Sequence, residues 1–218
     1  MKDKKIILFG ANGQLGFKLY DNLTSIGTVY TPTHRQIDFE QPDKLIKYVR
    51  EVAPHIIVNA AAFTAVDQAE TDNHLANEVN SIAPKILAEE AQSIGAILVH
   101  YSTDYVFDGS KNSPYQENDV PNPQSVYGRT KLAGEIEIRK NCDRYLIFRT
   151  SWVFGSHGHN FLKTILHMAE EYDDLRIVAD QRGTPTSATL IAEITEHVLR
   201  TLSHAVANDE RWGLYHVT

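Results

Sequence analysis

The chain has 218 residues, of which 42% are hydrophobic and 22% charged, the balance of an ordinary globular protein. The formal net charge is -7 and no run of Lys or Arg stands out, which excludes the footprint of a nucleic-acid-binding protein. Cys142 is the single cysteine, so an intrachain disulfide is excluded and a reducing compartment is favoured. Apolar stretches are too short for a signal peptide or a membrane span, and we expect a cytoplasmic protein with no membrane partner.

Short β-branched apolar runs alternate with longer amphipathic stretches along the first two thirds of the chain. This pattern predicts strands at residues 5–9, 28–31, 55–59, 96–101 and 144–149, and helices at residues 13–25, 42–52, 75–93 and 125–139. Pro84 is expected to break or restart the third of these helices. Because strands separated by helix-length segments are typical of βαβ units, we predict an α/β fold with a Rossmann doubly wound parallel sheet.

The character of the sequence changes after about residue 150, where segments become richer in glycine and histidine. Here we predict helices at residues 160–172 and 187–203 and short strands at residues 175–178 and 214–217. We predict a dinucleotide-binding Rossmann domain at residues 1–150. Residues 151–218 are expected to form a small, partial substrate-binding lobe interleaved with it, because no linker separates the two parts. The sequence stops on an apolar, strand-like segment, and we therefore expect it to be truncated.

A glycine-rich segment, GANGQLG at residues 10–16, follows the first predicted strand and opens the first predicted helix. The first glycine permits a tight turn, the second lets backbone approach a pyrophosphate, and the third lets helix and strand pack closely. A plain turn is the alternative, but the strand-turn-helix context and the helix N-terminus favour a bound dinucleotide. The residues predicted to hold it are Gly10, Asn12, Gly13, Gln14, Leu15 and Gly16.

The end of the second predicted strand distinguishes NAD from NADP. An acidic residue there binds the ribose 2′-hydroxyl of NAD, whereas a basic residue accepts the 2′-phosphate of NADP. Residues 30–35 contain no Asp or Glu, and Arg35 lies close by, so we predict NADP(H) and leave NAD(H) open. A solvated loop arginine is the other interpretation of Arg35. Further cofactor-binding residues are predicted beside the adenine (Asp38 and Phe39) and at the end of the third strand (Ala60, Ala61 and Ala62).

Tyr127 and Lys131 are four residues apart on a predicted helix, which places both side chains on one face. A tyrosine with a free pKa near ~10 is a poor proton donor at pH 7, and a lysine cation one turn away lowers that pKa. The hydroxyl can then protonate a carbonyl oxygen as hydride reaches its carbon. The spacing is weak on its own, but Thr103 at the end of the fourth strand could polarise the same carbonyl. An ordinary helix residue and a strand-end cap are the alternatives.

Six sequence stretches, which occur in order along nearly the whole chain, resemble those of a known family. They are GANGQLG (10–16), VNAAAFTAVDQAE (58–70), HYSTDYVFDG (100–109), VYGRTKLAGE (126–135), RTSWVFG (149–155) and DQRGTPTSA (180–188). The chain resembles the extended short-chain dehydrogenases/reductases and, more narrowly, the dTDP-4-dehydrorhamnose reductase family. This resemblance implies a sugar-nucleotide substrate and NAD(P)H-dependent reduction of the C4 keto group of dTDP-4-dehydro-L-rhamnose to dTDP-L-rhamnose.

The resemblance also implies roles for individual residues. Tyr127 would donate the proton, while Lys131 would bind the nicotinamide ribose and tune the tyrosine. Thr103 would hydrogen-bond the sugar carbonyl, and Asp104 would contact the sugar or adjust the local pKa. Further residues are implied for the substrate (Trp152, Gln181 and Arg182) and for the cofactor (Thr64 and Tyr101).

Other functions stay open at this stage. A regulatory subunit of methionine adenosyltransferase resembles the same reductases and binds NADP with no known need for turnover, although intact Tyr127, Lys131 and Thr103 favour an enzyme. An epimerase or dehydratase of the extended group is disfavoured because Tyr105, rather than a second acid, follows Asp104. The His-Gly-His segment at residues 157–159 is interpreted as a polar loop, so we predict no metal. A homodimer is left open.

Overall fold

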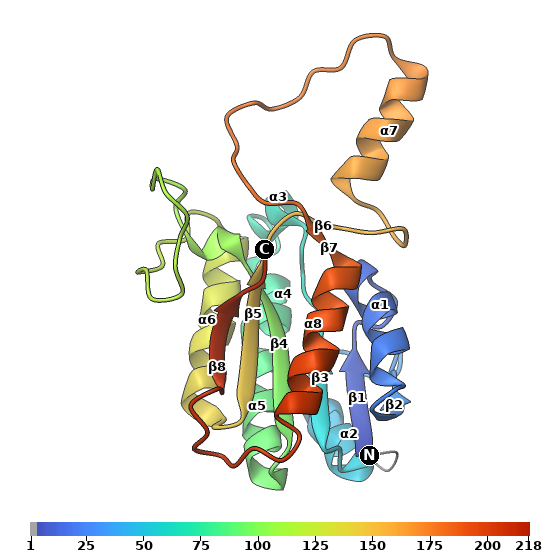
Figure 1. The fold of residues 1–218 in the computed structure, drawn as a ribbon, viewed down its shortest axis with the longest axis vertical. Helices are drawn as coiled ribbons and strands as arrows, with labels where there is room; N and C mark the ends of the chain where they lie inside the picture. Colours follow the sequence, from blue (N-terminus) through green and yellow to red (C-terminus); the bar gives the residue numbers. More distant parts are fainter. Residues whose placement is uncertain (1–3) are drawn as a thin grey trace.

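The computed structural model describes residues 4–218, so residues 1–3 of the predicted Rossmann domain lie outside the described part. Six strands form a parallel sheet in the order β2-β1-β3-β4-β5-β8 (Figure 1). They are β1 (Lys4–Phe9), β2 (Gly27–Tyr30), β3 (Ile56–Asn59), β4 (Ile97–Thr103), β5 (Tyr145–Thr150) and β8 (Gly213–His216). The strand order reverses between β1 and β3, and α/β proteins bind ligands outside the carboxyl ends of strands at such a switch point.

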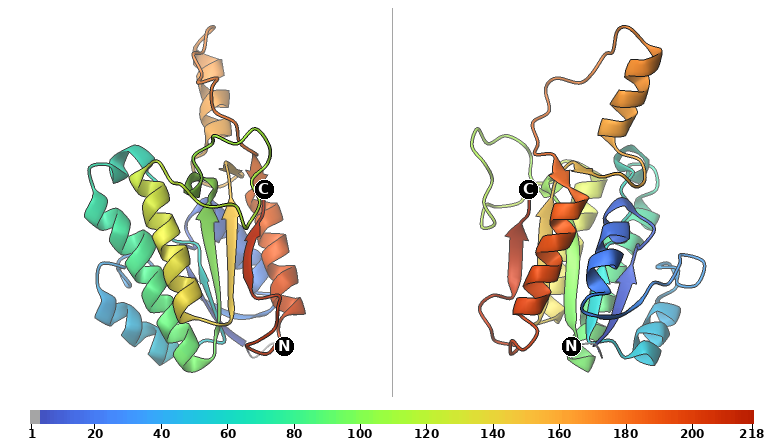
Figure 2. Two further views of the ribbon diagram at one scale, coloured as in Figure 1. Left: turned by 90° about the vertical axis from the view of Figure 1, so that its left-hand side faces the viewer. Right: turned by 45° about the vertical axis from the view of Figure 1, so that its right-hand side comes forward.

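Helices cover both faces of the sheet (Figure 2). They are α1 (Gln14–Leu23) and α8 (Ala188–Thr201) on one face, and α2 (Pro42–Val52), α5 (Ala83–Ile94) and α6 (Val126–Asn141) on the other. Successive residues of β1 alternate between the two resulting cores, with Ile6 on the α1 side and Ile7 on the α2 side. A strand buried on both faces must be apolar throughout, which explains the continuous apolar runs in the sequence. The predicted doubly wound parallel sheet is confirmed.

The helical segment before the fourth strand contains a π turn ahead of Pro84 and is otherwise continuous, so the expected break at this proline is wrong. It consists of α4 (Asn73–Asn77), a π-helical turn (Glu78–Ile82) and α5, and the short helix α3 (Val66–Ala69) precedes it. Pro84 lies in the first turn of α5. Proline has no N–H to donate, and its ring crowds the preceding turn of a helix. The wider π turn at Glu78–Ile82 accommodates that ring. Both ends of the π turn keep right-handed helical backbone, so the helix is widened before Pro84 and is not broken there.

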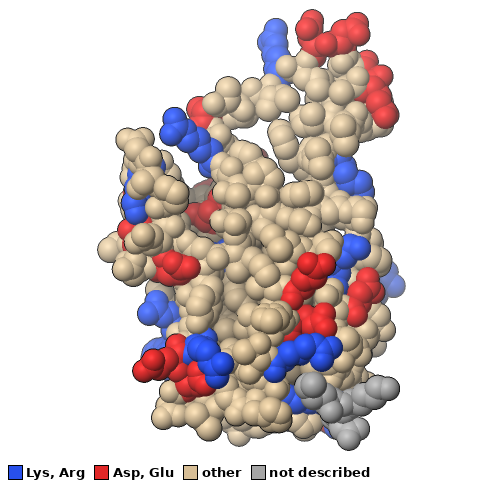
Figure 3. Space-filling model, in the orientation of Figure 1, with Lys and Arg blue, Asp and Glu red and all other residues tan. Residues whose placement is uncertain are grey.

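Residues 155–185 form an arm that leaves the body beyond the carboxyl edge of the sheet and carries α7 (Phe161–Glu171) (Figure 1). At its base β6 (Val153–Phe154) pairs in parallel with β7 (Thr186–Ser187). Acidic side chains gather at the outer end of the arm, where Asp173 and Asp174 follow α7 (Figure 3). After the arm, α8 and β8 return to the sheet. None of the helices within residues 4–218 combines the length and the apolar character needed to cross a bilayer.

The strand predicted at residues 175–178 is wrong. This segment of the arm pairs with no strand, and the side chains of Ile177 and Val178 are 50% and 67% exposed. A β-branched run favours a strand only where it finds a partner and a surface to bury against. On the arm it has neither.

A buried ion pair joins β5 to α6 below the carboxyl edge. The guanidinium of Arg149 donates to both carboxylate oxygens of Glu135, from Nη2 at 2.6 Å and from Nε at 2.9 Å. The two side chains are 4% and 1% exposed. Ser102 of β4 also donates to Glu135, and the guanidinium lies 5.0 Å from the centre of the Phe107 ring. Each buried charge is stabilised by the other in place of water, and the pair therefore fixes α6 against β4 and β5.

Removal of one partner should leave the other as an uncompensated buried charge. We therefore expect Arg149→Leu to lower the free energy of unfolding by about 3–5 kcal/mol, measured by urea unfolding followed by circular dichroism. The double variant Glu135→Leu with Arg149→Leu removes both charges and should recover part of this loss. A double variant less stable than the single one would contradict the assignment.

Candidate active site

The loop between β1 and α1 is built on two close backbone approaches. Gly10 has φ +78°, and a Cβ on it would lie 2.6 Å from the backbone carbon of Ala60. A Cβ on Gly16 would lie 2.0 Å from the carbonyl oxygen of Gly10. Since no side chain fits at either position, β1, α1 and the end of β3 meet more closely than other residues would allow.

The N-terminus of α1 opens at this loop. Gly13 is the N-cap residue, is exposed, and offers no side chain to accept hydrogen bonds from the first N–H groups of the helix. These groups and the positive end of the helix dipole suit a phosphate. A Cβ on Gly13 would stand 3.3 Å from the Gly10 carbonyl oxygen, so the protein itself nearly has room for one. The loop therefore fits the dinucleotide that the glycine spacing predicts.

The base of the arm packs over the same loop. The ring of His157 stacks on Phe17 with centroids 4.3 Å apart, and its Nε2 lies 3.1 Å from the carbonyl oxygen of Asn12. Asn160 donates from Nδ2 to Oε1 of Gln14 at 2.9 Å. Two of the predicted cofactor-binding residues, Asn12 and Gln14, are thus held by contacts from residues nearly 150 positions later.

Thr103 and Tyr127 meet at the carboxyl end of β4. Tyr127 lies in the first turn of α6. The N-cap residue of this helix is Ser125, whose hydroxyl accepts from the Gly128 N–H at 3.0 Å. Burial raises the pKa of Tyr127 to about 12, while hydrogen bonding with the Thr103 side chain opposes the rise. Asp104 accepts from the Thr103 hydroxyl at 3.1 Å, and burial raises the pKa of its carboxyl group. Tyr127 therefore carries its proton at neutral pH and can act as a donor.

Lys131 lies one turn after Tyr127 and is 1% exposed. Burial lowers the pKa of its amine to about 8, although the Glu135 carboxylate acts in the opposite direction. Its Nζ donates to the carbonyl oxygen of Tyr101 at 2.6 Å and lies 3.1 Å from Nε2 of His100. Tyr101 therefore reaches the site through its carbonyl group, because its hydroxyl hydrogen-bonds Thr195 of α8 at 2.8 Å.

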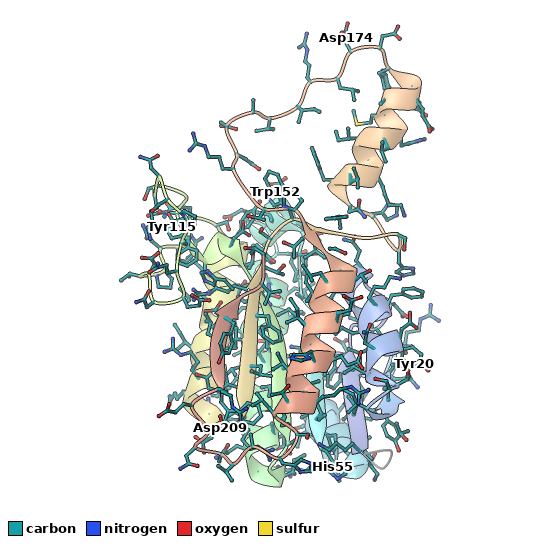
Figure 4. The ribbon with its side chains drawn as sticks, viewed as in Figure 1. Tyr20, His55, Tyr115, Trp152, Asp174 and Asp209 are labelled. Atoms are coloured by element: carbon teal, nitrogen blue, oxygen red, sulfur yellow. The ribbon has the colours of Figure 1, made fainter. Side chains whose placement is uncertain are left out.

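Trp152 follows β5 and lies at the base of the arm (Figure 4). Its φ of +43° is the left-handed conformation, which is strained for a bulky residue and often marks a functional site. The indole packs on the backbone of Gly183, where a Cβ would stand 2.4 Å from the ring. Ser151 donates to the carbonyl oxygen of Thr184 at 2.7 Å. These contacts hold residues 181–184 beside Trp152, with the side chains of Gln181 and Arg182 exposed.

The remaining predicted residues are spread along the carboxyl edge. Arg35 is exposed in the loop after β2, and the structure shows no hydrogen bond or ion pair from its side chain within residues 4–218. Phe39 is buried, and its ring meets Phe9 edge-on at 5.3 Å, so this ring belongs to the core. Asp38 is half-buried nearby. Ala60, Ala61 and Ala62 follow β3 next to Gly10, and Thr64 is exposed beyond them.

His100 and Asn59 were not singled out from the sequence. They lie opposite each other in the register of β3 and β4, and both side chains are 1% exposed. The signal was present, because each is a polar residue inside a run that is otherwise apolar. Polar side chains in fully buried strands need partners, and here they partner each other and Lys131.

The fold and these residues define an extended short-chain dehydrogenase/reductase architecture. The model of the RmlD substrate binding domain family matches residues 4–218, and the chain belongs to that family. It is 44% identical to the dTDP-4-dehydrorhamnose reductase of Burkholderia thailandensis over 215 residues, which are 98% of this chain and 72% of that protein.

Solved structures agree with this membership. A dTDP-4-dehydrorhamnose reductase from Clostridium acetobutylicum superposes with a TM-score of 0.91 and 39% identity, over 98% of this chain and 74% of that one. A second, from Bacillus anthracis in complex with NADP, gives a TM-score of 0.91 and 36% identity, over 100% of this chain and 75% of that one.

Gly13 and Gly16 differ in the space available for a side chain, and this difference provides a test of the cofactor site. Gly16→Ala should lower the midpoint of urea unfolding, because its Cβ would collide with the Gly10 carbonyl oxygen. Gly13→Ala should keep a near-normal midpoint and still weaken NADPH binding about tenfold or more, since a methyl group would stand between backbone and pyrophosphate. Both effects can be followed by unfolding curves and by NADPH fluorescence titration. Normal NADPH affinity in a folded Gly13→Ala variant would contradict the placement of the cofactor.

Proposed function

We propose that this protein reduces the C4 keto group of dTDP-4-dehydro-L-rhamnose with NADPH to give dTDP-L-rhamnose. The observation that carries the proposal is the pairing of a protonated, half-buried Tyr127 with Thr103 at the carboxyl edge, two strands away from an uncapped glycine loop. Family membership and the names of the similar proteins support the choice of substrate. Cytoplasmic location and a homodimer stay predictions from the sequence.

The cofactor would be held along the switch point of the sheet. We assign its pyrophosphate to the loop at residues 10–16 and its 2′-phosphate to Arg35, with NADH as a weaker alternative. Asp38 and the backbone at Phe39 would lie beside the adenine, residues 60–64 beside the cofactor backbone, and Lys131 at the nicotinamide ribose. When bound, the reduced nicotinamide supplies the hydride.

The protein's own groups act on the keto oxygen. With substrate bound, the Thr103 hydroxyl would turn from Asp104 to the keto oxygen, and Thr103 and Tyr127 would both donate hydrogen bonds to it, which polarises the carbonyl and orients it. As negative charge develops on that oxygen, Tyr127 gives up its proton. An ammonium at Lys131 favours the resulting phenolate and so reduces the cost of a tyrosine whose pKa burial has raised. Proton donation of this kind accelerates a reaction by roughly 10²–10⁴-fold.

The substrate would lie between the sheet and the arm. We assign Trp152 to the face of the sugar and Asp104 to a sugar hydroxyl. Gln181 and Arg182 would bind the diphosphate, for which a guanidinium is well suited. Their exposure and their place beside Trp152 support this assignment. We accordingly propose that residues 1–150 bind the dinucleotide and that residues 151–218 contribute the substrate-binding lobe.

Replacement of the proton donor is the direct test of the reaction. Tyr127→Phe should lower kcat by at least about 10²-fold, because no other side chain is assigned to protonate the keto oxygen. NADPH affinity should change little. NADPH oxidation with dTDP-4-dehydro-L-rhamnose, read at the nicotinamide absorbance band, measures the first, and fluorescence titration the second. A near-normal kcat in Tyr127→Phe would overturn the assignment. NADPH binding without turnover in the unaltered protein would instead favour the regulatory-subunit alternative.

Cofactor preference tests the assignment of Arg35. Arg35→Ala should weaken NADPH binding by about 1.5–3 kcal/mol, the contribution of a charge-assisted hydrogen bond, and leave NADH binding nearly unchanged. Because Arg35 is exposed and makes no ion pair within residues 4–218, the variant should fold normally. Paired fluorescence titrations with the two cofactors give the ratio. Equal losses for both, or tighter NADH binding by the unaltered protein, would contradict a 2′-phosphate contact.

A further inference from the structure

A chain of buried hydrogen bonds runs from the end of β3 to Lys131. The Ala61 N–H donates to Oδ1 of Asn59 at 3.1 Å. Nδ2 of Asn59 lies 3.2 Å from Nδ1 of His100, and Nε2 of His100 lies 3.1 Å from Nζ of Lys131. Nζ of Lys131 in turn lies 2.6 Å from the carbonyl oxygen of Tyr101. The side chains of Asn59, His100 and Lys131 are excluded from water by the sheet and α6, and the Ala61 N–H at the other end is half-buried.

The first link fixes the direction of the others. Because Oδ1 of Asn59 accepts from a backbone N–H, the amide nitrogen must be the atom that faces His100, and it can only donate. Nδ1 of His100 must then accept, so the neutral ring carries its proton on Nε2. That N–H points at Nζ of Lys131, and a lysine can accept it only as a neutral amine, since an ammonium has no lone pair.

We propose that His100 is a positioning residue for Lys131 that opposes protonation of the lysine amine, so that protonation of Lys131 is linked to the hydrogen bonds of His100 and Asn59. The proton that Lys131 takes up comes from solvent. Once Lys131 is an ammonium, His100 must either change tautomer, which breaks its bond with Asn59, or lose its contact with Nζ.

Of the titratable side chains within residues 4–218, His100 is the one that lies within hydrogen-bond distance of the Lys131 amine. From α6 come Lys131 and Glu135, and from β5 comes Arg149, which is paired with Glu135. On α5 the buried carboxylate Glu90 is paired with Arg50 of α2. Burial, followed by the charge of Lys131, lowers the pKa of His100 well below its usual value, so the ring is neutral when Lys131 titrates.

The consequence concerns the reductase activity and rests on the proposed function. The ammonium form of Lys131 is the form that stabilises a phenolate and binds a ribose. With its pKa lowered to about 8, this form dominates below pH 8 and is lost as the pH rises above it. Burial lowers this pKa, and by opposing the ammonium form further His100 contributes to the basic limit of the pH range over which the site works.

The test combines pH profiles of two variants with a spectroscopic measurement on the unaltered protein. His100→Gln replaces the Nε2–H donor by an amide that can turn its oxygen to Lys131, which stabilises the ammonium. We expect the basic limb of the kcat/KM profile, and the loss of NADPH affinity at high pH, to move upward by about one pH unit, a tenfold change in proton affinity. Ile147→Val is the control, because Ile147 lies opposite His100 in the sheet and is equally buried but makes no polar contact.

The tautomer can be read in the unaltered protein from two-bond ¹H–¹⁵N spectra of its histidine rings, with the His100 signals identified by their absence in His100→Gln or His100→Leu. The proposal predicts a neutral ring protonated at Nε2 above pH 9, and ring ¹⁵N shifts that change as Lys131 titrates near pH 8. A ring protonated at Nδ1, shifts that do not change with pH, or a basic limb that stays in place in a folded His100→Gln variant would each overturn it. Absence of turnover in the unaltered protein would sink the proposed reaction alone, because the spectra and the NADPH titration still decide the role of His100.

Discussion

The burial of Lys131 between α6 and β4 is the constraint to which the surrounding site is adjusted. An amine taken out of water loses its preference for the charged form unless nearby groups restore it. Here the Tyr101 carbonyl oxygen and the Glu135 carboxylate favour the ammonium, and the Nε2–H of His100 opposes it. Because Glu135 is itself paired with Arg149, it stabilises the ammonium less than a free carboxylate would. The ammonium and the neutral amine of Lys131 are therefore close in free energy. A small change in the site can then shift that balance, which a fully solvated lysine would not allow.

The parallel sheet brings these groups together because it aligns the carboxyl ends of its strands at one edge. Thr103 ends β4 and pairs in register with Thr150, the last residue of β5, so Trp152 follows directly beside it. Two strands away, β1 ends at Phe9, and Gly10 with its left-handed backbone begins the loop to α1. The cofactor loop and the proton donor thus share one edge, with β3 between β1 and β4. The alternation of β1 between two cores holds this edge in place from both faces.

Much of this arrangement could be predicted from the sequence, because the physical signals were local. Continuous apolar runs marked strands buried on both faces, Pro42 and Ser125 marked helix starts, and the spacing of Tyr127 and Lys131 marked one helix face. What could not be predicted depends on contacts between distant residues. The run at residues 175–178 has strand propensity but no partner, and the ring of Phe39 is taken up by Phe9. Likewise, the bond between Asn59 and His100 exists only because β3 and β4 pair in one particular register.

The two halves of the site differ in how far they are formed before a ligand arrives. On the cofactor side, Gly10, Gly16 and Lys131 are fixed by core packing and by backbone contacts that leave no space for movement. On the other side, Trp152 is 42% exposed, and the side chains of Gln181 and Arg182 project from an arm whose helix α7 buries none of its residues. Ordering exposed side chains costs about 0.5–1.5 kcal/mol each on binding. A sugar nucleotide must therefore spend part of its binding energy on the arm, whereas a dinucleotide meets a surface that folding has already organised.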